Sequence, residues 1–210
     1  MLGLPSYSMK TFDKHYKEVV LPQLAKEGGY SNFMAVPKIE KVVINTGVGS
    51  VKDENKKKSI VESISMIAGL IPSPRKAKTS IASFKLREGQ VVGYAVTLRG
   101  QRMRDFVSKL INVIIPRIRD FRGLDLNIVD SMGNMTIGFR DHTVFPETSE
   151  HDVRSAFGLA VTVTTTAKTK KEALALFLKL GFPFKKAGEE NIAISTNRKS
   201  PVKNKFGRKK

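Results

Sequence analysis

Hydrophobic positions along the chain change their period several times, and each change marks a new predicted element. Apolar residues recur at spacings of three and four in four stretches, which predicts helices at residues 10–28, 53–71, 102–115 and 170–180. β-Branched residues with partial alternation predict strands at residues 39–45, 90–99 and 158–167, with short strand candidates at 124–145 broken at Gly133 and Asn134. Helices and strands interleave in this order, which indicates an α+β fold.

The helical spacing also predicts which side chains face the interior. Pro22 predicts a bend or break in the first helix, because proline lacks the backbone N–H that continues the hydrogen-bond ladder. In the helix at 170–180, Leu174, Phe177 and Leu178 are expected to point inward. The inward residues expected in the helix at 53–71 are Ile60, Ile64, Ile67, Ala68 and Ile71.

The ends of the chain differ from its body. No obvious linker interrupts the predicted elements, so residues 1–186 are predicted to form a single domain with a loose start at 1–9. Residues 187–210 contain too few apolar side chains to fold alone, and we predict a basic extension that is disordered unless it binds RNA.

The net charge of the chain indicates a polyanionic partner, which the pattern of helices and strands alone does not. The 210 residues include 37 Lys and Arg against 19 Asp and Glu, a formal net charge of +18, and the pI is about 10.1. Residues 183–210 hold nine basic and two acidic side chains, so the remainder, with 28 basic and 17 acidic residues, still carries +11. The basic character therefore belongs to the folded body as well as to the tail, which favours nucleic acid as the partner.

Several classes of protein are excluded by what the sequence lacks. It contains no cysteine, so disulfides, thiolate metal sites and cysteine nucleophiles are excluded. No apolar run approaches the length of a membrane span, and the basic residues are spread over several segments, so no membrane partner is expected. The first residues show no signal-peptide pattern, and a cytoplasmic location is expected.

Enzymatic function has little support in the motifs. His142 and His151 stand beside carboxylates, but no nucleophile motif accompanies them, so neither a catalytic residue nor a metal or other cofactor is predicted. The sequence TGVG at 46–49 begins like a dinucleotide-binding turn, yet Lys52 stands where the third glycine would be. It is either a tight strand-to-helix turn or a place where the backbone approaches an RNA phosphate.

Basic residues gather instead in two internal segments. Residues 72–87 are predicted to be an exposed loop with five basic side chains, and residues 117–123 form a second basic connection. Phe84, Tyr94 and Phe121 lie near these charges, where they either stack on unpaired bases or belong to the core.

Six short segments occur in an order that resembles a known family. They are VINTGVG at 43–49, ASFKLREG at 82–89, VTLRG at 96–100, PRIRDFRG at 116–123, TTTAK at 164–168 and FPFKK at 182–186. Together they resemble the bacterial-type large-subunit ribosomal protein five family, which binds 5S ribosomal RNA. The resemblance covers residues 16–186 and implies a mainly antiparallel sheet with helices mostly on one face.

The resemblance also implies partners and contact residues. The family lies in the central protuberance of the large subunit, where its partners are 5S rRNA, large-subunit rRNA, neighbouring ribosomal proteins and peptidyl-site (P-site) tRNA. The positions that match its 5S rRNA-binding residues are Asn45, Thr46, Gly47, Phe84, Thr97 and Arg99. The family's loop toward P-site tRNA corresponds to residues 72–83, with Arg75, Lys76, Lys78, Thr79 and Ser80 as candidate contacts.

Two further points stay open at this stage. Arg117, Arg119 and Arg122 are candidates for a contact with ribosomal RNA or, across the intersubunit bridge, with a small-subunit head protein. The chain departs from the family pattern at Leu70, Lys78 and Thr79 and in its basic tail. The alternatives are an RNA-binding assembly or regulatory factor outside the mature ribosome, an enzyme acting on RNA, and an organellar rather than a cytoplasmic ribosome.

Overall fold

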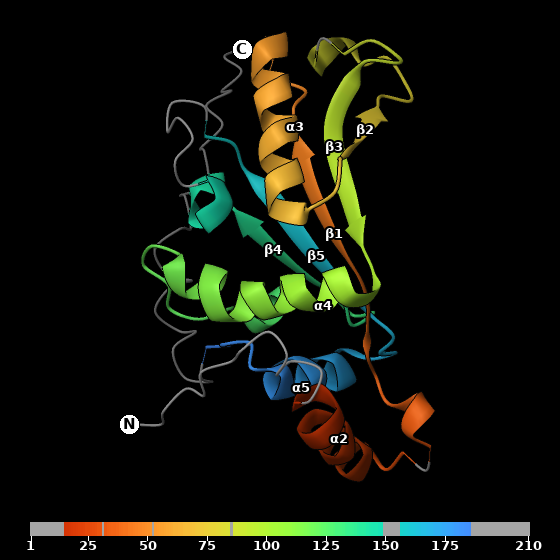
Figure 1. Cartoon of the computed structure of the whole chain (residues 1–210). Helices are drawn as coiled ribbons and strands as arrows, with labels where there is room; N and C mark the ends of the chain where they lie inside the picture. Colours follow the sequence, from red (N-terminus) through yellow and green to blue (C-terminus); the bar gives the residue numbers. More distant parts are fainter. Residues whose placement is uncertain (1–14, 31, 52, 85, 149–155, 186–210) are drawn as a thin grey trace, which may run out of the picture.

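A five-stranded antiparallel sheet lies at the centre of the computed structural model, in the strand order β2-β3-β1-β5-β4 (Figure 1). The structure describes residues 15–30, 32–51, 53–84, 86–148 and 156–185. The strands are β1 (Ile39–Gly47), β2 (Ser73–Lys76), β3 (Val91–Leu98), β4 (Met135–Phe139) and β5 (Leu159–Thr165). The predicted α+β class, with an antiparallel sheet, is confirmed.

The alternation of side chains divides the sheet into two unlike faces. In β5 the residues Val161 and Val163 are fully buried, whereas Thr162 and Thr164, which alternate with them, are half-buried. Successive side chains of a strand point to opposite faces, so the valines belong to the core face and the threonines to the other. We call this other face the open face.

Two helices, α3 (Glu54–Ala68) and α4 (Gly100–Lys109), pack against the core face of the sheet. The other two, α2 (Leu21–Gly28) and α5 (Lys170–Leu180), pack on each other and lie beyond α4 (Figure 1). The Asp53 carboxylate accepts from the backbone N–H of Asn55 at 2.9 Å and caps the start of α3, and Gly69, with φ +65°, ends it. Local capping therefore fixes where α3 begins and ends.

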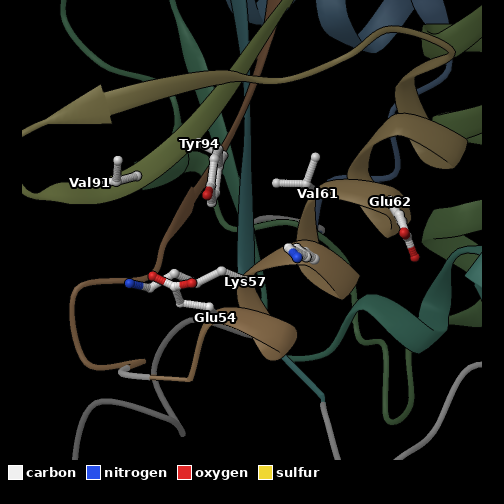
Figure 2. Close-up of a pocket in the computed structure, with 7 residues that line it drawn as sticks. Glu54, Lys57, Val61, Glu62, Val91 and Tyr94 are labelled. Carbon is white, nitrogen blue, oxygen red and sulfur yellow. The ribbon is translucent and has the colours of Figure 1, made fainter.

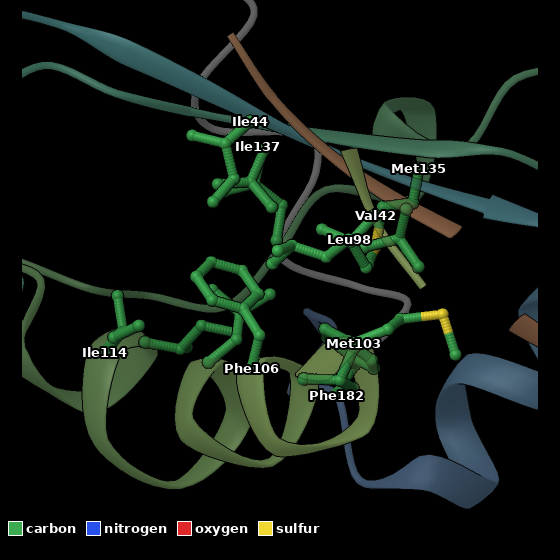
Figure 3. Close-up of a cluster of buried hydrophobic side chains, with 14 of the residues drawn as sticks. Val42, Ile44, Leu98, Met103, Phe106, Ile114, Met135, Ile137 and Phe182 are labelled. Atoms are coloured by element: carbon green, nitrogen blue, oxygen red, sulfur yellow. The ribbon is translucent and has the colours of Figure 1, made fainter. Parts of the chain in front are cut away.

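The core joins α4 and the segment after it to three strands of the sheet (Figure 3). Phe106 of α4, 4% exposed, lies beneath Leu98 of β3 and Ile137 of β4 in this view. After α4 the backbone continues as a π-helical turn, Leu110–Ile114, and a short 3₁₀ turn, Ile115–Arg117. Pro116 therefore lies inside a tightened last turn, one residue beyond the predicted end of this helix.

The first predicted helix changes its hydrogen bonding rather than breaking. A π-helical turn, Tyr16–Val20, leads directly into α2, and Val20 keeps helical dihedrals of −66° and −48°. Pro22 lies in the first turn of α2, directly after the π-helical turn, so the hydrogen-bond pattern changes where proline has no N–H to donate.

The prediction of an exposed loop over residues 72–87 is wrong in its first part. Ser73–Lys76 forms strand β2, which pairs antiparallel with β3. Its four residues are exposed, and a proline is tolerated in an edge strand because the outer backbone groups need no ladder partner. The rest of the segment includes a 3₁₀ turn, Ala82–Phe84.

Two predicted core positions are also wrong. Ile71 is 84% exposed because α3 ends at Ala68 and no longer carries it along the buried stripe. Leu178 is 56% exposed because the buried side of α5 runs through Ala173, Leu176, Phe177 and Leu180, which leaves Leu178 on the adjoining side.

The predicted loose start at 1–9 and the extension at 187–210 lie outside the described residues. Within the described ranges, no helix has the length and apolar character needed to cross a membrane.

Candidate nucleic-acid interface

Small and polar side chains make up the open face of the sheet. Because directly opposed residues of antiparallel strands share a face, the pair Asn45 and Ala95 and the pair Val43 and Thr97 place β1 and β3 side by side on it. The pairing continues across β5 and β4. The residues of the open face are Lys41, Val43, Asn45, Gly47, Ser73, Arg75, Gly93, Ala95, Thr97, Thr136, Gly138, Ala160, Thr162 and Thr164.

Two predicted contact residues lie on this face with their polar groups available. Asn45 and Thr97 are both exposed, and within the described residues neither side chain has a hydrogen-bond partner. Their amide and hydroxyl groups can each donate and accept, so they can pair with phosphate, ribose hydroxyl or base-edge atoms. The structure thus brings Asn45 and Thr97 together, although 51 positions separate them in the sequence.

Thr46 and Gly47, the next two predicted contact residues, point in opposite directions. Thr46 is 2% exposed, and its hydroxyl donates to the Gly158 carbonyl at 2.7 Å, so its side chain stabilises the β1–β5 end instead of facing solvent. Gly47 returns to the open face, and a Cβ built on it meets no atom within 4 Å. Of the three consecutive predicted residues, Asn45 and Gly47 therefore lie at the surface, whereas Thr46 stabilises the fold.

Several polar open-face residues are absent from the sequence prediction. Thr136, Thr162, Thr164 and Lys41 extend the polar surface across β4, β5 and the start of β1. The hydroxyl oxygens of Thr136 and Thr162 lie 3.0 Å apart and hydrogen-bond to each other. The strict valine and threonine alternation of β5 is the sequence signal that could have found two of them.

Arg99 stands at the end of β3, beyond the last ladder pair, and is already engaged. Its Nη1 lies 3.2 Å from Oε1 of Glu40, and the two side chains are 57% and 45% exposed. An ion pair this exposed contributes little to stability and exchanges readily with water or another anion. Arg99 is therefore available to a phosphate in exchange for Glu40.

The candidate tRNA segment is divided between the two faces of the sheet. Arg75 opposes Gly93, which in turn opposes Gly47, so the register places Arg75 on the open face. A bulge between Arg75 and Lys76 follows, and Lys76 opposes Val91. The first two of these basic residues therefore do not act as one patch.

The rest of that segment projects beyond the sheet. Lys78 and Thr79 are exposed, while the Ser80 hydroxyl donates to the Leu86 carbonyl at 2.9 Å and holds the turn together. Phe84, 72% exposed, is the aromatic side chain here that is free to stack on a base. Tyr94 and Phe121 are instead half-buried and pack against the core.

The last three candidates belong to a separate surface. Arg117, Arg119 and Arg122 are exposed on the connection that follows α4. Figure 1 shows this connection at the far end of α4 from the β2–β3 hairpin. The structure therefore does not bring these arginines to the open face.

A groove of about 550 Å³ lies on the helix side of β3 (Figure 2). Its walls are α3 and β3, with Val61, Val91 and Tyr94 as its apolar and aromatic parts. Two glutamates, Glu54 and Glu62, and two lysines, Lys57 and Lys58, share its rim. This balance of charge suits a polyanion less well than the open face, which carries no acidic residue among the positions named above.

The histidine motif has a structural explanation. His142 is 1% exposed, and its ring stacks on Phe157 with centroids 4.4 Å apart and planes at 11°. Its Nδ1 accepts from the backbone N–H of Phe157 at 3.4 Å. His151 lies outside the described residues, and within the described ranges no three His, Cys, Asp or Glu side chains gather in a way that could hold a metal ion.

Comparisons with known proteins match this sequence over almost all of the described residues. Residues 32–87 match the family described as Ribosomal protein L5, and residues 91–184 match the ribosomal L5P family C-terminus. Similar proteins include Large ribosomal subunit protein uL5 of Ureaplasma parvum serovar 3, 48% identical over 81% of this chain and 94% of that protein. Its counterpart in Mycoplasma mycoides subsp. mycoides is 46% identical over 81% and 96% of the two chains.

A third relative, Large ribosomal subunit protein uL5 of Halothermothrix orenii, is 45% identical over 84% of this chain and 99% of its own length. The relatives are matched over nearly their whole lengths at this identity, and the two family models together cover residues 32–87 and 91–184. These matches show which family the chain belongs to. The chain belongs to the ribosomal protein L5 (uL5) family and is a structural, non-enzymatic component of the large ribosomal subunit whose partners are ribosomal RNA and ribosomal proteins.

Proposed function

We propose that this chain binds 5S rRNA through the open face of its sheet. The observation that carries the proposal is the composition of that face, where hydroxyl, amide and glycine positions lie beside Lys41 and Arg75. Asn45 and Thr97 supply unpaired hydrogen-bonding groups near its centre, and Gly47 leaves the surface flat beside them.

The chemistry of this face suits a folded, double-helical RNA better than unpaired bases. The minor groove of A-form RNA is wide and shallow and displays 2′-hydroxyls, which side-chain hydroxyls and amides can reach. Single-strand binding on a sheet relies instead on exposed aromatic rings, and none occurs among the open-face residues named above. The proposed contact is therefore one of hydrogen bonds and close backbone approach.

The second part of the proposal concerns P-site tRNA. The exposed residues Lys76, Lys78 and Thr79 lie beyond the register shift between β2 and β3, off the open face, and can meet a second RNA. Because lysine ammonium groups contact phosphate without reading bases, such a contact acts on all tRNA species alike. Arg75 is assigned to the 5S rRNA side, since the register places it beside Gly93.

The 5S rRNA assignment is tested by substituting the two unpaired polar side chains. Asn45→Ala and Thr97→Ala should each weaken 5S rRNA binding by about 0.5–1.5 kcal/mol, as one lost hydrogen bond does, with no change in melting temperature. Asn127→Ala is the matched control, because Asn127 is equally exposed but lies on a 3₁₀ turn, Leu126–Ile128, away from the open face. Equal affinities for all three folded variants would place the 5S rRNA contact elsewhere.

The tRNA assignment needs assembled ribosomes. Replacing Lys76 and Lys78 with Ala removes two exposed charges, so the fold and 5S rRNA binding should persist. Dissociation of P-site tRNA from purified mutant ribosomes should become faster, whereas Arg75→Ala should weaken 5S rRNA binding and leave tRNA dissociation unchanged. The reverse pattern would contradict the division between Arg75 and Lys76.

A further inference from the structure

A cavity of about 470 Å³ lies between the π-helical turn Tyr16–Val20, the start of β1, α4 and the end of α5. Its lining joins the ring of Tyr16 to four apolar side chains, which are Ile39, Met103, Val107 and Leu180. We call this cavity the Tyr16 pocket. Its volume falls within the range of about 300–1,000 Å³ that is typical of cavities holding small molecules.

Tyr16 combines an aromatic ring with an unpaired hydroxyl at this pocket. The residue is half-buried, and its hydroxyl has no hydrogen-bond partner among the described residues. Burial raises the pKa of this hydroxyl, so it stays protonated and able to donate at neutral pH. Tyr16 is also the first residue of a π-helical turn, a rare geometry that is frequent at functional sites. Both the ring and the hydroxyl are therefore available to a ligand.

The charged residues of the lining favour an anion. The basic ones are Lys17, Lys38 and Arg104. Lys17 and Lys38 are exposed, and neither has an ion-pair partner within the described ranges. Among the described residues of the lining the acidic one is Glu40, which already pairs with Arg99 at 3.2 Å. The two lysines are therefore free to bind a negative group.

The groove between α3 and β3 provides a contrast within the same molecule. It also contains a tyrosine, Tyr94, together with apolar side chains and two lysines. Two glutamates, Glu54 and Glu62, balance those lysines. The two cavities thus share an aromatic ring and an apolar wall but differ in charge, so an anionic ligand is expected in the Tyr16 pocket and not in the groove.

The ligand of the Tyr16 pocket has to combine a flat apolar part with a negative charge. Proteins hold unpaired nucleotides by stacking the base on an aromatic ring and placing basic side chains along the phosphates. One nucleotide carries both parts, and the chain belongs to a family of ribosomal proteins, whose partners include RNA. The open-face residues named above include no aromatic ring, so the pocket offers a kind of contact that they do not.

We propose that the Tyr16 pocket binds one unpaired purine nucleotide of RNA, with the base against the Tyr16 ring and the phosphate on Lys17 and Lys38. A purine is favoured because its two fused rings give the larger stacking surface. Glu40 lines the pocket and pairs with Arg99 at the end of β3, so RNA on the open face can place an unpaired nucleotide here. The role of the pocket is independent of which RNA occupies that face.

Methionine-methyl NMR of the full-length chain with adenosine 5′-monophosphate tests the pocket directly. Met103 lines the pocket and is 7% exposed, whereas Met66, 46% exposed, lies on α3. The ring current of a bound base should shift the Met103 methyl signal and leave the Met66 signal in place. Ribose 5-phosphate, which lacks the base, should not reproduce this shift. An unmoved Met103 signal at about 10 mM nucleotide, which excludes even millimolar affinity, would overturn the proposal.

Substitutions separate the contribution of the base from that of the phosphate. Tyr16→Leu should weaken binding of a single-stranded purine heptanucleotide about fivefold or more, as expected for the loss of one stacked base. Tyr16→Phe keeps the ring and should lose clearly less affinity. Lys17→Ala/Lys38→Ala should reduce the slope of log K against log salt by about 1, because up to two phosphate contacts are lost.

The matched controls lie in the groove between α3 and β3. Tyr94→Leu and Lys57→Ala/Lys58→Ala remove the same groups there and should have clearly smaller effects on heptanucleotide binding. Equal losses in both sets of variants would overturn the proposal, because affinity would then follow net charge alone. Melting temperatures show which variants are folded, and the NMR titration of the unsubstituted chain decides the question even if Tyr16→Leu unfolds.

A competition experiment separates a nucleotide from other anionic ligands. Octanoate has an apolar chain and a carboxylate but no flat base, so it should displace adenosine 5′-monophosphate poorly. Tighter binding of octanoate than of the nucleotide would overturn the assignment to RNA and favour a carboxylate ligand. Asn45→Ala and Thr97→Ala should leave the Met103 shift unchanged, so a failure of the 5S rRNA proposal is recognised separately.

Discussion

Gly47→Val gives a demanding prediction, because it should act in opposite directions on folding and on RNA binding. Gly47 ends β1 on the open face, and its Cβ would meet no atom within 4 Å. Valine is favoured in strands, and glycine loses more backbone entropy on folding, so the free energy of unfolding should stay the same or rise by up to about 1 kcal/mol.

The binding penalty follows from what the new side chain obstructs. A valine at position 47 raises three carbon atoms above the flat surface next to Asn45, and an RNA helix lying on the face must move away from it. Losing the hydrogen bonds of Asn45 and Thr97 together costs about 1–3 kcal/mol, which is roughly a 5-fold to 150-fold loss of affinity. The proposed contact therefore predicts a stable protein that binds 5S rRNA poorly.

Two measurements decide this prediction. Denaturant unfolding gives the free energy of unfolding, and a filter or fluorescence titration gives the affinity for 5S rRNA. Asn127→Val adds the same side chain at an exposed site on the Leu126–Ile128 turn and should leave the affinity unchanged. Wild-type affinity of the Gly47→Val variant, in a protein shown to be folded, would refute the argument that RNA lies flat on this face.

Other predictions concern the fold and the electrostatics. Gly93→Ala should lower the free energy of unfolding by about 1–3 kcal/mol in a denaturant titration, because the new Cβ would lie 2.8 Å from the backbone oxygen of Thr46. Thr46→Val should lower it by about 1–2 kcal/mol, since the Gly158 carbonyl loses its 2.7 Å hydrogen bond, while the affinity of the folded fraction for 5S rRNA should not change. Phe106→Ala should cost about 3–5 kcal/mol of stability through the cavity left between α4 and the sheet. Affinity for 5S rRNA should fall as salt rises, because residues 1–182 alone carry +11, and a flat salt dependence would contradict phosphate contacts by the basic side chains beside the open face.

Elements whose signals are local could be predicted from the sequence. Helix α5 was bounded correctly because Thr169 caps its start and Gly181, with φ +93°, ends it. Strand β5 follows from strict alternation. Strand β2 was missed because Pro74 and its basic neighbours favour a loop locally, and only pairing with β3, a partner in another part of the chain, makes the segment a strand.

Some residues of the candidate site could likewise be placed from local sequence patterns, and others could not. The alternation of Ile44, Thr46 and Val48 on the core side contains the information that Thr46 is buried. In contrast, the position of Arg75 on the open face depends on its register against Gly93, including the bulge that follows, which no local pattern specifies. Residue types therefore indicated an RNA-binding protein, and strand register was needed to say which side chains share a surface.

The most direct test of the central claim maps RNA from the open face itself. Because the chain has no cysteine, Thr97→Cys provides a unique attachment site for a hydroxyl-radical probe in the middle of that face. Ser59→Cys on α3 places the same probe on the helix side of the molecule. In reconstituted large subunits, the probe at position 97 should cleave 5S rRNA strongly and the probe at position 59 weakly. Strong cleavage of 5S rRNA from position 59, with none from position 97, would show that 5S rRNA binds elsewhere on this protein.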